Sequence, residues 1–141
     1  MSVSSLPLYV VDASIPTKWY LSDEELALEA DRVSLDYRLG RTRLLAPDHI
    51  RQEVANAVRN VVRRGRISQA DAEVAIAEDL TWDMPLVDTG TLLESGLTHA
   101  FRDDCALYDA LYIALAELLG CAFVYADRFT QALWIEDYGK T

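Results

Sequence analysis

The sequence predicts an α/β fold in which a mostly parallel sheet of four or five short strands lies between two layers of helices. Apolar runs of strand length alternate with stretches of helical periodicity along the chain, and consecutive parallel strands need such helical connections. No linker, repeat or low-complexity segment divides the 141 residues, a length typical of one domain. We therefore expect a single three-layer domain over residues 1–141.

The N-terminal part begins with a strand and continues into a helix. Residues 8–11 form a short apolar run that ends at Asp12, which is typical of a buried parallel strand. Ser22 and Glu25 have the spacing of a capping box, in which each satisfies a backbone N–H of the other. This pair predicts the start of a helix that reaches about Leu39.

Five elements follow in the middle of the chain. They are a strand at 43–46, a helix from Pro47 to about Arg64, a helix from Ser68 to about Leu80, a weak strand at 85–87 and a helical stretch at 89–101. Pro47 suits a helix start, Gly65 suits a helix end, and Ser68 with Asp71 has the N-cap spacing.

The C-terminal part contains the strongest helical pattern. It covers residues 106–119, and Gly120 closes it. A strand at 121–125 then leads to Asp127, and a short helix is expected at 129–135. Asp12 and Asp127 therefore both follow the carboxyl ends of strands, where ligands gather in parallel sheets.

Charge and composition exclude several classes of protein. The 23 Asp and Glu exceed the 13 Lys and Arg, and the net charge of −10 argues against a passive nucleic-acid binder. The same balance is compatible with a nuclease that approaches nucleic acid through metal ions. No apolar run is long enough to span a bilayer and no signal peptide is expected, so we expect no membrane association. Cys105 and Cys121 lack a spacing motif and suit a reducing cytoplasm.

Two further carboxylates occupy positions where apolar residues are expected. Asp109 is the one polar residue between Ala106 and Ala116, so we expect it on a buried helix stripe. Glu53 lies on the apolar face of its helix, between Ile50 and Ala57. A first-turn acid near the helix dipole would explain Asp109, and an acid that reaches solvent at the rim would explain Glu53.

Asp12, Glu53, Asp109 and Asp127 are more informative together than singly. Each of the two strand-end acids, taken alone, could simply cap a turn. Four carboxylates at one edge of the sheet cannot all stay ionised without cations. Oxygen ligands without His or Cys favour Mg²⁺ or Mn²⁺, and such ions assist phosphodiester hydrolysis. The four acids therefore predict a metal-dependent site for this reaction.

Four sequence blocks also carry a resemblance to a known family. They are Val10–Ser14, Glu53–Ala57, Tyr108–Ala116 and Ala126–Arg128. In order and spacing they resemble the PIN domain, and in particular the VapC-type toxins of toxin–antitoxin pairs, over roughly residues 8–133. Tyr125 departs from the pattern, because the family usually has Thr or Ser two residues before its last Asp. The family's frequent last apolar strand is also absent from residues 134–141.

The resemblance implies a Mg²⁺- or Mn²⁺-dependent endoribonuclease with a PIN-like fold. The acidic positions of the family match Asp12, Glu53, Asp109 and Asp127, which would hold metal and carry catalysis. Two polar residues match supporting positions, namely Ser14 beside the first acid and Asn56 beside the Glu. Implied partners are an RNA substrate, a cognate antitoxin protein and a second copy of the chain in a homodimer.

Two other functions remain as alternatives. A catalytically silent PIN-fold module would bind antitoxin or RNA without cutting, and Tyr125 is the feature that favours it. A phospho-acceptor signalling domain would need paired acids after the first strand, but Ala13 and Ser14 follow Asp12.

Several residues near the motifs have simpler interpretations. His49 and His99 lack ligand partners in the sequence and are interpreted as structural. Lys18 lies close to the first acidic motif and is a candidate for phosphate contact. The aromatic residues Trp19, Tyr20 and Tyr37 are interpreted as core or as a partner surface, in preference to base stacking. Asp103 and Asp104 are expected to cap the helix that follows them.

Overall fold

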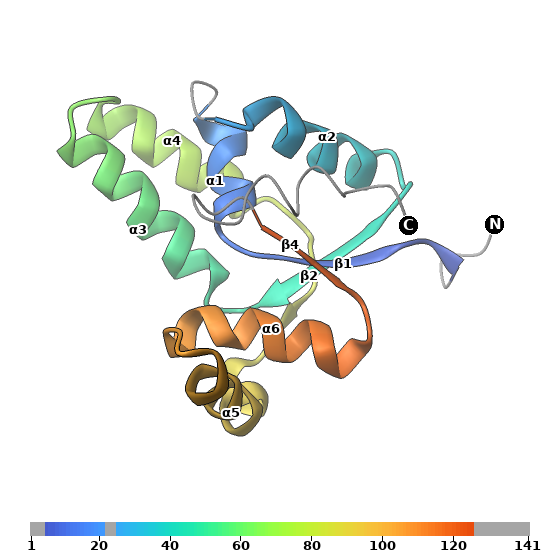
Figure 1. The fold of residues 1–141 in the computed structure, drawn as a ribbon. Helices are drawn as coiled ribbons and strands as arrows, with labels where there is room; N and C mark the ends of the chain where they lie inside the picture. The colour runs from blue at the N-terminus through green and yellow to red at the C-terminus, as the bar shows by residue number, and fades with distance from the viewer. Residues whose placement is uncertain (1–4, 22–24, 126–141) are drawn as a thin grey trace.

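A parallel four-stranded sheet lies at the centre of the molecule (Figure 1). The structure is a computed structural model, and it describes residues 5–21 and 25–125. The strands are β1 (Leu8–Val11), β2 (Arg43–Pro47), β3 (Leu86–Val87) and β4 (Ala122–Val124). Their spatial order is β3-β2-β1-β4, and every pair is parallel. This confirms the predicted α/β class and the predicted strands.

Helices connect the strands and cover both faces of the sheet. They are α1 (Ser14–Tyr20), α2 (Ala27–Arg38), α3 (Ile50–Arg63), α4 (Gln69–Asp79), a 3₁₀ turn η2 (Thr89–Leu92), α5 (Leu93–Asp103) and α6 (Leu107–Leu119). In Figure 1, α6 lies below the sheet with α5 outside it, and α1 and α2 lie above the sheet. The three layers are therefore those expected from the alternation of strands and helices.

The C-terminal ends predicted for α3 and α6 and the N-cap predicted for α4 are confirmed. The start predicted for α3 at Pro47 is wrong, because Pro47 is the last residue of β2 and α3 begins at Ile50. Gly65 and Gly120 have φ of +75° and +62°, which a residue without Cβ adopts at little cost. Ser68 Oγ accepts a hydrogen bond of 3.0 Å from the backbone N–H of Asp71, as its capping role requires.

The region between β1 and β2 differs from the prediction. The sequence did not indicate α1, because seven residues with Pro16 among them are too few to display a helical period. The expected capping box is wrong at its described residue, because Glu25 lies in a turn and α2 begins only at Ala27. Leu26 has φ of 62° and separates this turn from the helix. Ser22 lies outside the described residues.

Helix α6 is buried on one side only, although its nearly continuous apolar sequence is typical of a helix that is buried all round. Leu111, Tyr112 and Leu115 are at most 2% exposed and join the central core. Tyr108 and Leu118 are 63% and 71% exposed, because the sheet and α5 do not cover the remaining face. The cap expected from Asp103 or Asp104 is also wrong, since Ala106 is the N-cap of α6 and makes no side-chain cap.

Some predictions concern residues that the structure does not describe. The short helix at 129–135 and Asp127 are both in this group. Within residues 5–21 and 25–125, no helix has the combination of length and apolar character needed to cross a membrane.

Candidate active site

The site begins at the carboxyl end of β1, where Asp12 leads into α1. The backbone N–H of Ser14 donates a 3.0 Å hydrogen bond to Asp12 Oδ1, and the Ser14 hydroxyl donates to the same oxygen. The N–H of Ile15 bonds to the Asp12 carbonyl at 3.2 Å. The turn from strand to helix therefore fixes the orientation of the Asp12 carboxylate, and Ser14 has the supporting position expected for it.

Glu53 lies in the first turn of α3 and is held from two directions. Tyr112 of α6 donates a hydrogen bond of 2.5 Å to Glu53 Oε1, and His49 Nε2 lies 3.2 Å from the same oxygen. His49 Nε2 is also 3.0 Å from the carbonyl oxygen of Tyr108. Because both neighbours of Nε2 are acceptors, Nε2 carries the proton and donates.

Asp109 lies in the first turn of α6 and is exposed, so the expectation of a buried position was wrong. The physical reason is its place at the helix start, where the carboxylate is near the positive end of the dipole and open to solvent. This agrees with the alternative first-turn explanation of the sequence pattern. Exposure does not remove Asp109 from the site, because its side chain borders the same cavity as the other acids.

One cavity of about 310 Å³ brings the three described acids together. Its lining residues are Asp12, Ala13, Ser14, Thr17, Lys18, Glu53, Ala57 and Asp109. Asp127 lies outside the described residues, so the structure does not place it. Asn56 is exposed on α3 and is not among the lining residues.

The environment of the cavity disfavours the charged form of the Asp12 side chain. Burial raises the pKa of Asp12 from 3.8 to about 7, although its hydrogen bonds from Ser14 act in the opposite direction. The negative charges of Glu53 and Asp109 raise it further. Asp12 therefore carries a carboxylate that gains from a nearby cation, as expected for a buried acid beside like charges.

His49 and Glu53 form a mutually stabilised pair. Burial opposes ionisation of Glu53, but hydrogen bonds from His49 and Tyr112 outweigh it, and the pKa of Glu53 is lowered. Burial also opposes protonation of His49, but the hydrogen bond and charge of Glu53 outweigh it and raise the pKa of His49. Glu53 is therefore more readily ionised than Asp12.

The donor chemistry of the cavity fits a hard divalent cation. Its acidic side chains offer carboxylate oxygens, which Mg²⁺ and Mn²⁺ prefer as ligands. A bound cation would also stabilise the charged form of Asp12, whose pKa is raised in the metal-free cavity. In the described part of the chain, no three Asp, Glu, His or Cys side chains lie close enough to hold one ion jointly. Mg²⁺ commonly binds one or two carboxylates directly and keeps several waters, so these donors still suit it.

Sequence reasoning overlooked two residues of this site. His49 is four positions before Glu53, a spacing that puts both on one helix face, and this signal was available. Tyr112 is 59 residues from Glu53, and nothing in the sequence links the two. The structural interpretation of His49 therefore omitted its direct contact with a predicted site residue.

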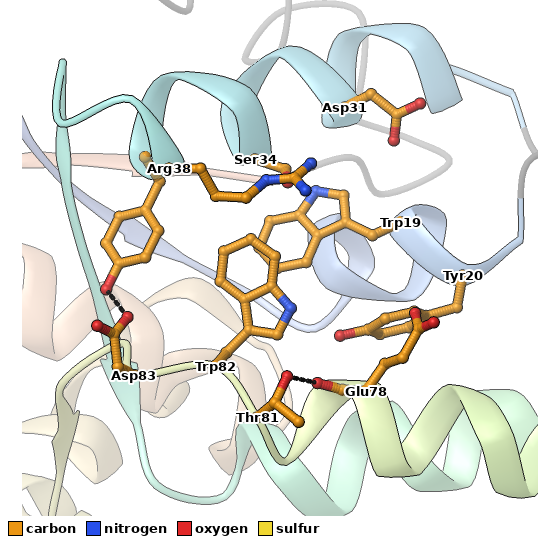
Figure 2. A pocket seen from close by; sticks show the side chains of 10 residues that line it. Trp19, Tyr20, Asp31, Ser34, Arg38, Glu78, Thr81, Trp82 and Asp83 are labelled. Carbon is orange, nitrogen blue, oxygen red and sulfur yellow. Dashed lines mark hydrogen bonds between the residues drawn. The ribbon is translucent and has the colours of Figure 1, made fainter.

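A second, larger cavity lies between α1, α2 and the segment after α4 (Figure 2). Its volume is about 840 Å³, and it shares no lining residue with the acidic cavity. Trp19 stacks on Trp82 with ring centroids 4.4 Å apart, and the Arg38 guanidinium lies 5.8 Å from the Trp82 ring centroid. Tyr37 donates a 2.7 Å hydrogen bond to Asp83. The aromatic residues near the N-terminus thus pack elements together around this cavity.

Comparisons with known sequences give consistent matches over most of the chain. The family model described as PIN domain matches residues 9–131. Ribonuclease VapC3 of Mycobacterium tuberculosis is 34% identical over 128 residues, which are 89% of this chain and 86% of that protein. Ribonuclease VapC9 of the same organism is 31% identical over 123 residues, which are 85% of this chain and 86% of that protein.

Two solved structures are similar to this chain over most of its length. PAE2754 from Pyrobaculum aerophilum has a TM-score of 0.64 and 24% identity, with 90% of this chain and 84% of that chain covered. Mycobacterium tuberculosis VapC20, described as a sarcin-ricin loop cleaving toxin, has a TM-score of 0.63 and 20% identity. That match covers 91% of this chain and 97% of VapC20. At these identities the two structures establish a shared fold.

Proposed function

The chain belongs to the PIN domain family and to its VapC-type members, and from this premise we propose that it is a ribonuclease toxin of a toxin–antitoxin pair. The observation that carries the proposal is the convergence of Asp12, Glu53 and Asp109 on one cavity at the carboxyl end of β1. Relatives named as ribonucleases, at 31% to 34% identity over most of the chain, support the same activity.

In its finer form, the proposal is an endoribonuclease that uses Mg²⁺ or Mn²⁺. Asp12, Glu53, Asp109 and Asp127 would hold the metal, which activates water and stabilises charge on a phosphodiester when it is bound. Ser14 orients the Asp12 carboxylate through its two hydrogen bonds.

The anchoring of Glu53 supports a direct role in the cavity. Tyr112 and His49 both meet Oε1 and hold the carboxylate in place. Because both partners stabilise the charged form, Glu53 is ionised at neutral pH and can attract a cation or accept a proton from water.

We further propose a cognate antitoxin protein, a homodimer and a cytoplasmic location. A cavity lined by three acids is complementary to a basic side chain of a protein inhibitor. Cys105 and Cys121 are free thiols, which suits a reducing compartment. Oligomeric state is tested by light scattering of the purified chain, and the antitoxin by co-purification with the product of a neighbouring gene.

The test of the activity is cleavage of total RNA by purified protein freed of any antitoxin. We expect cuts at a few sites with Mn²⁺ or Mg²⁺, none with EDTA, and none with Asp109→Asn. Sequencing the new 5′ ends would identify the target RNA. A folded protein that cuts nothing under any metal condition would contradict the proposal and favour the silent PIN-fold module.

A further inference from the structure

Lys18 occupies an unusual place for a lysine. It is in the last turn of α1 and only 8% exposed, and within the described ranges it is the one Lys or Arg that is buried. Its side chain lines the cavity of Asp12, Glu53 and Asp109. Lysine is rarely buried without a partner of opposite charge, so this position indicates an interaction inside the cavity.

Local geometry explains why Lys18 faces the cavity. It is four residues after Ser14, and residues with this spacing lie on the same face of a helix. Ser14 is the residue that hydrogen-bonds to Asp12, so that face of α1 is directed toward the acids. The start of α1 therefore orients one acid, and its next turn adds a positive charge to the same cavity.

Lys18 lines the same cavity as the acids but forms no ion pair with the described ones. Among residues 5–21 and 25–125, none of the ion pairs includes Lys18. A cation that borders an acidic cavity and is paired with none of the described carboxylates is available for an incoming anion. A compact ammonium group is a common partner of phosphate oxygens.

We propose that Lys18 is a substrate-binding residue that contacts a phosphate of the RNA backbone at the acidic cavity. This inference rests on the proposed ribonuclease function. An RNA phosphate approaching three carboxylates is repelled, and metal bound to the acids reduces that repulsion. Lys18 offers these phosphates a basic side chain that belongs to the protein itself, and it directs the backbone to this end of the cavity.

The test measures RNA binding separately from cleavage. A short fluorescein-labelled single-stranded RNA is titrated with protein in Ca²⁺, which compensates the acids, and a gel verifies that the RNA stays intact. For Lys18→Met, we expect binding about tenfold weaker or more, the usual loss for a charged hydrogen bond. Lys18→Arg should recover most of the affinity. Arg32→Met, which removes the same charge from an exposed site on α2, should change affinity less than about twofold.

Salt dependence distinguishes a phosphate contact from a structural role. Loss of one phosphate contact should reduce the slope of log affinity against log salt by about 0.7 for single-stranded RNA. An unchanged slope in Lys18→Met would overturn the proposal even if affinity falls. Calorimetry with Mn²⁺ is the companion measurement, and we expect unchanged or tighter binding in Lys18→Met, because a repelling charge is removed. Weaker Mn²⁺ binding would assign Lys18 to holding the acids instead.

The outcomes separate the two proposals. If wild-type protein neither binds nor cleaves RNA with metal, the ribonuclease function fails. If the wild type binds and cleaves but Lys18→Met binds RNA equally well, only the role of Lys18 fails. Thermal unfolding of each variant verifies that the comparison is made between folded proteins.

Discussion

Tyr112 donates a 2.5 Å hydrogen bond to Glu53 across 59 residues of sequence, and this bond joins α6 to α3 at the acidic cavity. Tyr112 is 1% exposed, and its pKa is strongly raised. Burial is the main cause, and the hydrogen bond to Glu53 and the negative charge of Glu53 add to it. The phenol therefore stays protonated and acts as a permanent donor. The same helix carries Asp109 three residues earlier, so one helix start supplies an acid to the cavity and fixes another.

Tyr112→Phe tests this anchor. The substitution keeps the ring and removes one donor to a charged, partly buried carboxylate, so we expect a loss of about 1–3 kcal/mol in the free energy of unfolding. Urea titration at pH 7 gives this number, and calorimetry should show weaker Mn²⁺ binding. Tyr108→Phe on the exposed face of α6 is the matched control, expected to change neither quantity. Equal stability of the two variants would show that the bond contributes nothing.

Asp109→Asn should remove activity without unfolding the protein. Asp109 is exposed in the first turn of α6, so we expect the loss of its charge to lower the free energy of unfolding by at most about 1 kcal/mol. Cleavage should fall by about 100-fold or more, because Asp109 would hold the metal ion that stabilises negative charge on the phosphodiester. Asp104→Asn is the control, since Asp104 is exposed, borders no part of the cavity and has φ of 49°, which Asn tolerates. Comparable loss in both variants would contradict a specific role.

The raised pKa of Asp12 predicts an unusual dependence of stability on pH. Its folded pKa of about 7 is above the model-compound value of 3.8, so the folded state binds more protons between these values. Stability of the metal-free protein should therefore fall as pH rises from about 4 to 7 and then level off. In EDTA at pH 8, the free energy of unfolding of Asp12→Asn should exceed that of the wild type by roughly 1–3 kcal/mol, a range that includes a reduction for screening by solvent. Near pH 4 the two proteins should be equally stable.

Denaturant titrations across this range provide the measurement, and added Mg²⁺ should reduce the advantage of the Asn variant. The cation compensates the wild-type carboxylate and cannot compensate an amide equally. An Asp12→Asn variant that is less stable than wild type at pH 8 in EDTA would show that burial does not penalise this carboxylate.

The sequence was sufficient to predict the strands of the sheet, but not α1 or the turn that precedes α2. The strands of a doubly covered parallel sheet are continuous apolar runs, so Leu8–Val11 was identified with its exact bounds. Helix α1 has fewer than two full turns and contains Pro16, so no period was visible. Leu26 in the left-handed region reflects tertiary packing that overrides its local preference.

The acidic site could be predicted in part, because some of its residues are marked by local sequence patterns. Asp12 follows a strand and Glu53 interrupts an apolar helix face, and both patterns are local. Contacts between distant segments leave no local trace, and the bond from Tyr112 to Glu53 is such a contact. The exposure of Asp109 was mispredicted because an apolar surrounding sequence does not reveal which end of a helix the protein covers.

The packing of α5 on α6 supplies a stability prediction that is independent of the chemistry. A Cβ at Gly96 would lie 2.8 Å from Leu111 Cδ2 and 3.5 Å from Leu107 Cδ1. Gly to Ala within a helix normally gains up to about 1 kcal/mol, but overpacking a core costs about 1–3 kcal/mol. We expect Gly96→Ala to lower the free energy of unfolding by about 1 kcal/mol, whereas Ser95→Ala on the exposed face should be neutral or stabilising.

A double-mutant cycle with Leu111→Val locates the cause of that loss. Leu111→Val alone should destabilise by removing a methylene group from the core, by about 1 kcal/mol. If the clash is the reason, Gly96→Ala should cost less, or become favourable, when Val is at position 111, because the obstructing Cδ2 atom is gone. The coupling energy should then be at least about 0.5 kcal/mol in the compensating direction. Strictly additive effects in urea titration would instead mean that α5 and α6 shift apart to accommodate the extra methyl group.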